Sequence, residues 1–565
     1  MFECIPDAAP RAPNHMMLTD PDRFDKTFTP RNNPLNWDNS QASRSTEMRT
    51  RHLGSLVVLA VVAATTPALA ATPCADLKSL KLSNTTITMA EVVAAGPFVQ
   101  PGRAGGPPAP AGAPAGRGGA PAAPPLMLPA HCRIAATLAP SSDSDIKIEV
   151  WMPSEGWNGK YQAVGNGGWA GVISYPAMAA ALREGYATSS TDTGHVGGTS
   201  GPLIGHPEKV IDYSHRAVHE MVVTSKKIID AFYTQPIRLS YWNGCSTGGR
   251  QGLMSAQRFP DDFDAILAGA PANYHSHLHS NDLINAVPAL TTPGALLPQA
   301  KLNMLNQAVL NACDAHDGVK DGLLNNPGAC KFDPATLACK AGDAENCFTP
   351  AQLESVKRMY ASSKFSDGKV IFPGKTIGSE ASWTAILDTQ KQPIFVATGS
   401  FQLAYQDPNW DWTKLDIDRD VKFVDEKTGF INATDPDLSK FKARGGKILM
   451  YHGWNDVAIS PQNSIDYYKS VQAKMGGNQS DFIRLFMVPG MGHCQGGPGT
   501  DVFDKVAAID RWVESGVKPT SIPASHMSGG VADRTRPLCA YPAVAKYSGS
   551  GSTDDARNFR CEAPR

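Results

Sequence analysis

Ser246 belongs to a pentapeptide whose residue types and spacing favour nucleophilic chemistry. The pentapeptide 244–248, Gly-Cys-Ser-Thr-Gly, follows a segment, 237–242, whose residues alternate with the period of a β-strand. It precedes a segment, 250–259, with the periodicity of a helix. Because glycine lacks a Cβ atom, the backbone can turn sharply between the two. A serine on such a turn exposes its hydroxyl, so the pattern predicts a nucleophile elbow with Ser246 as the nucleophile.

A serine nucleophile needs a base and a group that orients the base. After an elbow these partners follow in the order Asp or Glu, then His. Asp456 comes after an expected strand at 447–451, and His493 after an expected strand at 483–488. Both therefore lie at carboxyl ends of strands, where open α/β sheets carry their sites. We expect His493 to take the Ser246 proton and Asp456 to orient the imidazole.

Other polar residues compete for these roles. Asp321 and Asp466 are alternative acids, but neither follows a strand as directly as Asp456 does. Asp456 as a loop carboxylate without a catalytic role is a further alternative. We expect His452 to form a hydrogen bond within the site rather than to act as the base.

An oxyanion hole needs backbone N–H donors beside the nucleophile. Thr247, the residue after Ser246, is expected to supply the first. The second is expected from the glycine-rich turn at 165–168, with Gly168 preferred to Gly167. A turn with only a structural role is the alternative there.

The segments around these residues alternate between strand and helix patterns. We expect strands at 146–151, 186–191 and 263–270, and helices at 218–232 and 507–513. The rhythm is lost between 273 and 435 and resumes at 447. The sequence therefore predicts an α/β-hydrolase fold with a large inserted lid domain. The catalytic domain would comprise 71–272 and 436–565, and the lid 273–435.

The N-terminal region contains an export signal. Arg49 and Arg51 precede an apolar run of about a dozen residues, too short to span a bilayer, and 68–70, Ala-Leu-Ala, forms a cleavage site. We predict a signal peptide at 48–70 and a secreted or periplasmic protein. Residues 1–47 would be a wrongly annotated extension upstream of the true initiator, Met48. The Pro/Ala/Gly-rich stretch 101–125 is expected to be a disordered loop.

Charge and cysteine content narrow the class further. The formal net charge of −1 offers no strong field for nucleic acid or an anionic membrane. Of eleven cysteines, Cys4 precedes the signal, so an even set remains, which in an exported protein indicates disulfides. Close spacing favours Cys313–Cys330, Cys339–Cys347 and Cys539–Cys561; Cys74–Cys132 would then span an N-terminal loop, which leaves Cys245 and Cys494 for each other. Sequence alone does not prove this connectivity, and two buried free thiols are the alternative for the last pair.

A bridge from Cys245 to Cys494 would have a direct consequence. Cys245 precedes the nucleophile and Cys494 follows the base. A disulfide holds its two Cα atoms about 5.5–6 Å apart. The bridge would therefore clamp the elbow to the histidine loop.

This arrangement resembles the tannase/feruloyl esterase family, which includes mono(2-hydroxyethyl) terephthalate hydrolase-like enzymes. The resemblance rests on the segments 243–252, 185–195, 492–494 and 536–561, and extends from about Cys74 to the C-terminus. Only the Pro/Ala/Gly-rich stretch departs from it. The resemblance implies an α/β-hydrolase with a lid, a Ser-His-Asp triad and the Cys245–Cys494 bridge.

The lid contains a loop, 314–323, in which carboxylates and glycines alternate as around a hard cation. We expect structural Ca²⁺ there, and the resemblance implies the same ion at these positions; the ligands would be the side chains of Asp314, Asp317 and Asp321 and the carbonyls of Val319 and Leu323. An Asp/Gly turn without metal is the alternative. The sequence 275–279, His-Ser-His-Leu-His, resembles a zinc site on a strand but lacks a fourth ligand at metal spacing.

We therefore expect a secreted serine carboxylesterase that hydrolyses esters of aromatic, phenolic acids, such as feruloyl or galloyl esters, through an acyl-enzyme. A mono(2-hydroxyethyl) terephthalate-type monoester hydrolase is the alternative, followed by an acyltransferase and by a non-catalytic calcium-dependent binding module. The partner would be a small aromatic ester, with no nucleic acid and no membrane. For the acid-side pocket in the lid, the candidates are Trp383, Phe395 and Phe401, with Lys375 or Arg444 beside a polar substituent.

Overall fold

The computed structural model describes residues 72–102, 125–387 and 392–564. The expected N-terminal extension, 1–47, and signal peptide, 48–70, lie outside the described residues. So does nearly all of the Pro/Ala/Gly-rich stretch 101–125.

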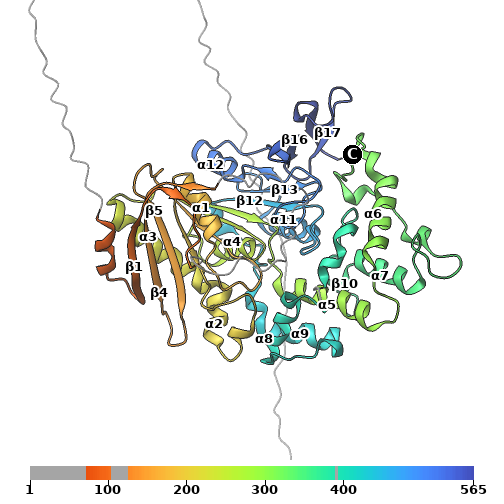
Figure 1. Ribbon diagram of the computed structural model, residues 1–565, viewed down its shortest axis with the longest axis horizontal. Coiled ribbons are helices and arrows are strands. Elements are labelled where there is room, and N and C mark those ends of the chain that lie inside the picture. Colours follow the sequence, from red (N-terminus) through yellow and green to blue (C-terminus); the bar gives the residue numbers. More distant parts are fainter. Residues whose placement is uncertain (1–71, 103–124, 388–391, 565) are drawn as a thin grey trace, which may run out of the picture. The chain divides into compact units, whose positions relative to one another are not determined.

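Within the described residues, a nine-stranded sheet in the order β1-β4-β5-β7-β6-β8-β9-β12-β13 forms the centre of the catalytic region (Figure 1). Adjacent strands from β7 to β13 in this order are parallel, whereas β1, β4 and β5 form an antiparallel edge. The strands are β1 (Thr85–Val93), β4 (His131–Leu138), β5 (Ile146–Pro153), β6 (Lys160–Val164), β7 (Ala187–Thr191), β8 (Leu239–Cys245), β9 (Ala265–Gly269), β12 (Lys447–Gly453) and β13 (Ile483–Val488).

The expected strands correspond to β5, β7, β8, β9, β12 and β13. The strand expected at 237–242 begins at Leu239 and continues to Cys245. Every residue of β6, β7 and β9 is buried, because a parallel sheet is covered on both faces.

Helices pack on both faces of this sheet. One face carries α3 (Ala217–Tyr233), α4 (Thr247–Arg258) and α11 (Pro461–Met475), and the apolar core beneath them includes Met450. The other face carries α1 (Tyr175–Arg183) and α12 (Lys505–Ser515), and the apolar core beneath them includes Tyr451. Neighbouring residues of β12 therefore enter opposite cores, as the two-residue period of a strand requires. The architecture confirms the α/β-hydrolase fold.

Between β9 and β12 the chain leaves the sheet and forms the lid, drawn in green and cyan in Figure 1. The lid has its own apolar cores. Its elements are α5 (His275–Thr291), α6 (Gln299–Cys313), α7 (Pro350–Tyr360), β10 (Ser363–Lys364), β11 (Val370–Phe372), α8 (Phe395–Tyr405) and α9 (Ile417–Thr428), followed by α10 (Ser439–Ala443), which leads back to the sheet. Helix α5 has little hydrophobic periodicity because many of the residues that it buries are polar.

Helix α5 corrects one expectation. The three histidines of 275–279 lie on a helix, so His277 points away from the face that His275 and His279 share. His277 contacts Asp425 and the carbonyl of Ile371 instead.

Small sheets and disulfides complete the fold. The remaining strands are β2 (Gly96–Pro97), β3 (Met127–Leu128), β14 (Val502–Phe503), β15 (Ser521–Ser528), β16 (Val531–Cys539), β17 (Val544–Tyr547) and β18 (Phe559–Glu562). The remaining helix, α2 (Pro207–Ile211), continues through a π-helical turn, Asp212–Arg216, into α3. Five disulfides join the ten cysteines of the described residues, in the pairing expected from their spacing. In this part of the chain no helix has the length and apolar character that crossing a bilayer requires.

Candidate active site

Ser246 lies at the junction of β8 and α4, in a strained backbone conformation with φ 62° and ψ −124°. Non-glycine residues rarely adopt positive φ, and such strain persists only where the surroundings enforce it. Two backbone hydrogen bonds do so: the Ser246 N–H donates to the carbonyl of Gly269 (2.9 Å), and the N–H of Ala272 donates to the carbonyl of Ser246 (3.0 Å). The geometry is that of the expected nucleophile elbow.

Gly244 permits this turn because the first turn of α4 packs directly against it. A Cβ atom at Gly244 would lie 2.5 Å from the carbonyl carbon of Gly248. The Gly248 carbonyl in turn accepts a hydrogen bond from the Trp242 indole (2.8 Å), so it has little freedom to move.

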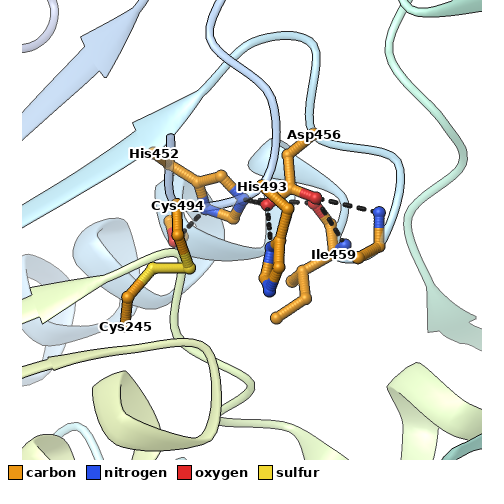
Figure 2. The surroundings of a disulfide bond; sticks show 8 residues. Cys245, His452, Asp456, Ile459, His493 and Cys494 are labelled. Carbon is orange, nitrogen blue, oxygen red and sulfur yellow. Dashed lines mark hydrogen bonds and ion pairs between the residues drawn. A yellow bond between two sulfur atoms is a disulfide. The ribbon is translucent and has the colours of Figure 1, made fainter. Parts of the chain in front are cut away.

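Asp456 and His493 lie in the loops that follow β12 and β13, and they contact each other (Figure 2). His493 Nδ1 lies 2.7 Å from Asp456 Oδ2. The other carboxylate oxygen accepts backbone N–H bonds from Ala458 (2.9 Å) and Ile459 (3.0 Å). The Asp456 carboxylate is fully buried and held from both sides.

These contacts shift the pKa values of both groups. Burial alone would raise the pKa of Asp456, but the charges and hydrogen bonds of His493 and His452 outweigh burial and lower it. Burial likewise opposes the charged form of His493, yet the negative charge of Asp456 and its hydrogen bond raise the pKa of His493 above its usual value. Asp456 therefore stays ionised beside a more basic imidazole.

His452 is a second imidazole on the same carboxylate. Its Nε2 lies 3.0 Å from Asp456 Oδ2 and 3.1 Å from the Ile459 carbonyl, and its Nδ1 lies 2.7 Å from Ser464 Oγ (Figure 2). Because both neighbours of Nε2 are hydrogen-bond acceptors, Nε2 carries a hydrogen. His452 thus donates to Asp456 and has no exposed surface, as expected for a residue that is not the base.

The two alternative acids lie elsewhere. Asp321 pairs with Arg536 (2.8 Å), and Asp466 accepts a hydrogen bond from Gln462 on the surface of α11 (2.7 Å). Neither contacts His493.

The Cys245–Cys494 disulfide joins the elbow to the histidine loop, with 6.0 Å between its Cα atoms (Figure 2). Each cysteine is the chain neighbour of one reacting residue, Ser246 or His493. Cys494 also has a positive φ of 67°.

Among the described residues, neither the Ser246 hydroxyl nor His493 Nε2 has a hydrogen-bond partner. Such bonds are often long in a free enzyme and tighten in the substrate complex.

The expected oxyanion donors are brought together beside the elbow. Thr247 is the first residue of α4, so its N–H has no acceptor within the helix. Its hydroxyl donates to the carbonyl of Gly168 (2.8 Å), which ties the glycine-rich turn to the elbow. The N–H of Gly168 has no acceptor among the described residues, so both N–H groups are free to bind an oxyanion.

Two side chains that the sequence analysis did not single out hold this turn. The Tyr213 hydroxyl donates to the Gly168 carbonyl (2.9 Å), and His195 Nε2 contacts the carbonyl of Trp169 (2.7 Å). Tyr213 lies in a π-helical turn, a feature common at functional sites. His195 comes just after β7, and this position near the end of a strand is the sequence signal that could have identified it.

Buried Arg250 connects α4, the helix after the elbow, to the π-helical turn and to the lid. Its guanidinium donates to the carbonyls of Ser214 (2.9 Å), Tyr213 (3.3 Å) and Ile431 (3.0 Å). Burial lowers the pKa of Arg250 because no carboxylate compensates its charge. One side chain of α4 thus binds both the π-helical turn and the end of the lid.

The expected calcium loop brings its carboxylates near one another but partners them with the protein. Asp314 accepts the N–H groups of Asp321 (3.2 Å) and Gly322 (3.0 Å), and Asp317 accepts that of Val319 (2.9 Å). Burial, followed by the charges of Asp321 and Asp314, raises the pKa of Asp317 to about 6. In the described part of the chain, no three His, Cys, Asp or Glu residues are grouped as metal ligands.

The acid-side pocket stays a prediction, although the structure describes most of its candidate residues. Trp383 and Phe401 are buried in the lid, and the side chain of Phe395 is outside what the structure describes. Lys375 is buried and bonded to Asp282 and to the Val457 carbonyl, because an unpaired ammonium could not be buried there. Arg444 contacts the carbonyl of Phe263, which precedes β9, so it lies at the opposite end of the strands from the site.

A protein-family model and two related sequences match this chain. The family model described as tannase and feruloyl esterase matches residues 132–562. An uncharacterized esterase of Xanthomonas campestris pv. campestris is 35% identical over 90% of this chain and 94% of its own, and a probable feruloyl esterase B-2 of Aspergillus terreus is 34% identical over 76% and 86%.

Two solved structures resemble the structure of this chain. The crystal structure of feruloyl esterase B from Aspergillus oryzae has a TM-score of 0.78 and 29% identity, covering 86% of this chain and 99% of that one. Tannin acyl hydrolase from Aspergillus niger, at 22% identity and a TM-score of 0.68 over 86% and 92%, shares the fold.

The bridge between the two loops generates the first prediction. The chain-entropy model assigns a disulfide that closes 249 residues a stabilisation of about 5 kcal/mol, against about 2.5 kcal/mol for the Cys339–Cys347 pair, which closes 8. Cys245→Ala/Cys494→Ala should lower Tm and reduce kcat/KM for an aromatic ester by at least about tenfold, because the two loops lose their register. Cys339→Ala/Cys347→Ala is the matched control and should retain full kcat/KM. A bridge-free variant with unchanged kcat/KM would refute the positioning role.

His452 generates the second prediction, measured as the pH dependence of kcat/KM. The base must be neutral to act, so kcat/KM should rise with pH through the pKa of His493, which lies above its ordinary value. His452→Leu removes one donor from Asp456, makes that carboxylate more basic and so raises the pKa of His493 further. The acid limb should move upward by about one pH unit.

His452→Gln, which can still donate, should return the limb toward its original position. If the leucine variant kept the original acid limb, His452 would serve packing alone.

Proposed function

Because the chain belongs to the tannase and feruloyl esterase family and is therefore a carboxylic ester hydrolase, we propose that it is an exported serine esterase that works through an acyl-enzyme. The family supports esters of phenolic acids as the substrate class, and the reaction partner is a small-molecule ester. The observation that carries the serine mechanism is the covalent link between the strained elbow and the histidine that contacts buried Asp456.

The reaction begins with proton transfer from Ser246. His493 Nε2 accepts the hydroxyl proton as Oγ attacks the ester carbonyl, and Asp456 stabilises the imidazolium through Nδ1. The N–H groups of Thr247 and Gly168 receive the developing oxyanion. Each such donor is typically worth about 2.7–4 kcal/mol in the transition state.

The tetrahedral intermediate collapses when His493 returns the proton to the leaving alcohol. The C–O bond to the alcohol breaks, and the acyl group remains bonded to Ser246. Water then attacks this ester with His493 as the base, and the acid leaves with Ser246 regenerated.

The proposed acid is a hydroxycinnamic or hydroxybenzoic acid. The relative in Aspergillus terreus is named a probable feruloyl esterase, and the structural neighbour from Aspergillus oryzae a feruloyl esterase B. A terephthalate monoester is the alternative, because its ester carbonyl is attached directly to an aromatic ring, as in a hydroxybenzoate ester.

Export is part of the proposal. The expected signal peptide at 48–70 would direct the chain out of the cytoplasm. The five disulfides among the described residues fit an extracellular protein, since thiols stay reduced in most cytosols.

The loop 314–323 is proposed to bind structural Ca²⁺. The ligands would be the carboxylates of Asp314, Asp317 and Asp321 and the carbonyls of Val319 and Leu323. The support is electrostatic: burial, and after it the charges of Asp321 and Asp314, raises the pKa of Asp317, and a hard cation would offset both effects. The ion would stabilise the lid and take no part in the reaction.

A panel of methyl ferulate, methyl gallate, chlorogenate and mono(2-hydroxyethyl) terephthalate tests the activity. At least one ester should be hydrolysed, and Ser246→Ala should reduce kcat by at least about 10⁴-fold. Ser528→Ala, an exposed serine on β15, is the control and should change nothing. A fluorophosphonate should label the native protein once and leave the Ser246→Ala variant unlabelled. Hydrolysis that survived in that variant would overturn the assignment.

Calcium removal tests the lid site through thermal unfolding. Chelation should lower Tm by about 5 °C, and added Ca²⁺ but not Mg²⁺ should restore it. Asp317→Asn should abolish the response, whereas a change at an exposed residue of α7, Glu354→Gln, should preserve it. A Tm that does not respond to chelation would count against the ion.

A further inference from the structure

The lid contains a cavity, of about 390 Å³, that the mechanism does not use. It lies between α5, α6, α7 and the 3₁₀ turn Glu380–Ile386. Its size is within the range typical of small-molecule sites, about 300–1,000 Å³. Ser246, Asp456, His493 and the oxyanion donors are all absent from its lining.

The walls of this lid cavity are mostly apolar. Leu302, Met359 and Trp383 line it and belong to one buried core of the lid. The Trp383 indole N–H donates to Ser379 Oγ (3.0 Å), so its polar edge is satisfied and its ring is available for apolar contact. The cavity therefore suits a flat hydrophobic group.

Arg358 is the charged residue of the lining. It lies on α7 and is half-buried, and among the described residues it has neither a hydrogen bond nor an ion pair. Glu354, one helical turn earlier, forms no ion pair with it. A guanidinium can donate two parallel hydrogen bonds to a carboxylate.

Several other polar groups at the lid cavity already have partners; the buried Asn285 Oδ1, also in its lining, has none among the described residues, but as an acceptor it cannot bind an anion. The Ser355 hydroxyl donates to the carbonyl of Ala295 (2.8 Å), Gln299 Nε2 donates to that of Ala381 (2.7 Å), and the Thr384 hydroxyl contacts Gln299 Oε1 (3.2 Å). An incoming anion would thus be recognised by Arg358.

We propose that the lid cavity is a non-catalytic binding site for an aromatic monocarboxylate, with the carboxylate on Arg358 and the ring against Trp383. Charge complementarity selects an anion, and the apolar walls select an aromatic body. The choice of aromatic acid rests on the proposed function, since an esterase of this kind releases such an acid. Trp383 and Val457 belong to one buried core, and Val457 directly follows Asp456 in the chain. A ligand in the lid cavity would therefore contact the core that packs beside the catalytic acid.

Calorimetric titration of ferulate into the full-length Ser246→Ala protein tests the site without turnover. Arg358→Leu, added to that background, should weaken binding at least tenfold. Lys357→Leu removes an equal charge from the exposed face of the same helix and should leave the affinity unchanged. Coniferyl alcohol, which has the same ring without the carboxylate, should bind at least tenfold more weakly than ferulate.

A second variant guards against misfolding. Ala289→Trp keeps Arg358 but fills the lid cavity, and it should abolish binding while Tm and the circular dichroism spectrum stay native. Binding that ignores both changes, or no binding at all, would overturn the proposal.

The location is tested separately from the esterase activity. Methyl ferulate, a ligand for the catalytic site, should not displace ferulate from the lid cavity. Displacement by methyl ferulate would place the acid at the catalytic site instead. A protein that bound ferulate through Arg358 but hydrolysed no ester would overturn the proposed function alone.

Discussion

The Cys245–Cys494 disulfide is the constraint on which the arrangement of the site depends. Ser246 and His493 follow strands that lie on opposite sides of β9 and β12, and they are 247 positions apart in the sequence. Packing alone would leave two exposed loops free to shift by the ångström that matters for proton transfer. A covalent bond between their immediate neighbours holds the Cα atoms 6.0 Å apart.

The second level of organisation is the buried Asp456 carboxylate. An ionised carboxylate without partners could not be buried there, because desolvation would protonate it. Four donors remove that penalty: two imidazoles on Oδ2 and two backbone N–H groups on Oδ1. The same carboxylate that orients His493 is therefore kept charged by His452 and by the turn that follows it.

The sequence predicted the strands and helices near the elbow because parallel strands are nearly continuous apolar runs and the helices beside them have an apolar stripe. It did not predict α5, because that helix buries His275, Ser276 and Asp282 against polar partners from distant segments. Periodicity of hydrophobicity cannot detect a polar face that becomes buried only when the lid packs on the catalytic domain.

Residue order and cysteine spacing, taken alone, determined the candidate nucleophile, acid and base, and a bridge that could join them, because strand ends and chain neighbours are local properties. The tertiary structure decided which polar side chains serve those residues. It assigned Tyr213 to the Gly168 carbonyl, His452 to Asp456, Lys375 to Asp282 instead of substrate, and Arg444 to the far end of the strands. Such partners lie far apart in the chain and meet only through the packing of sheet and lid, so no local pattern encodes them.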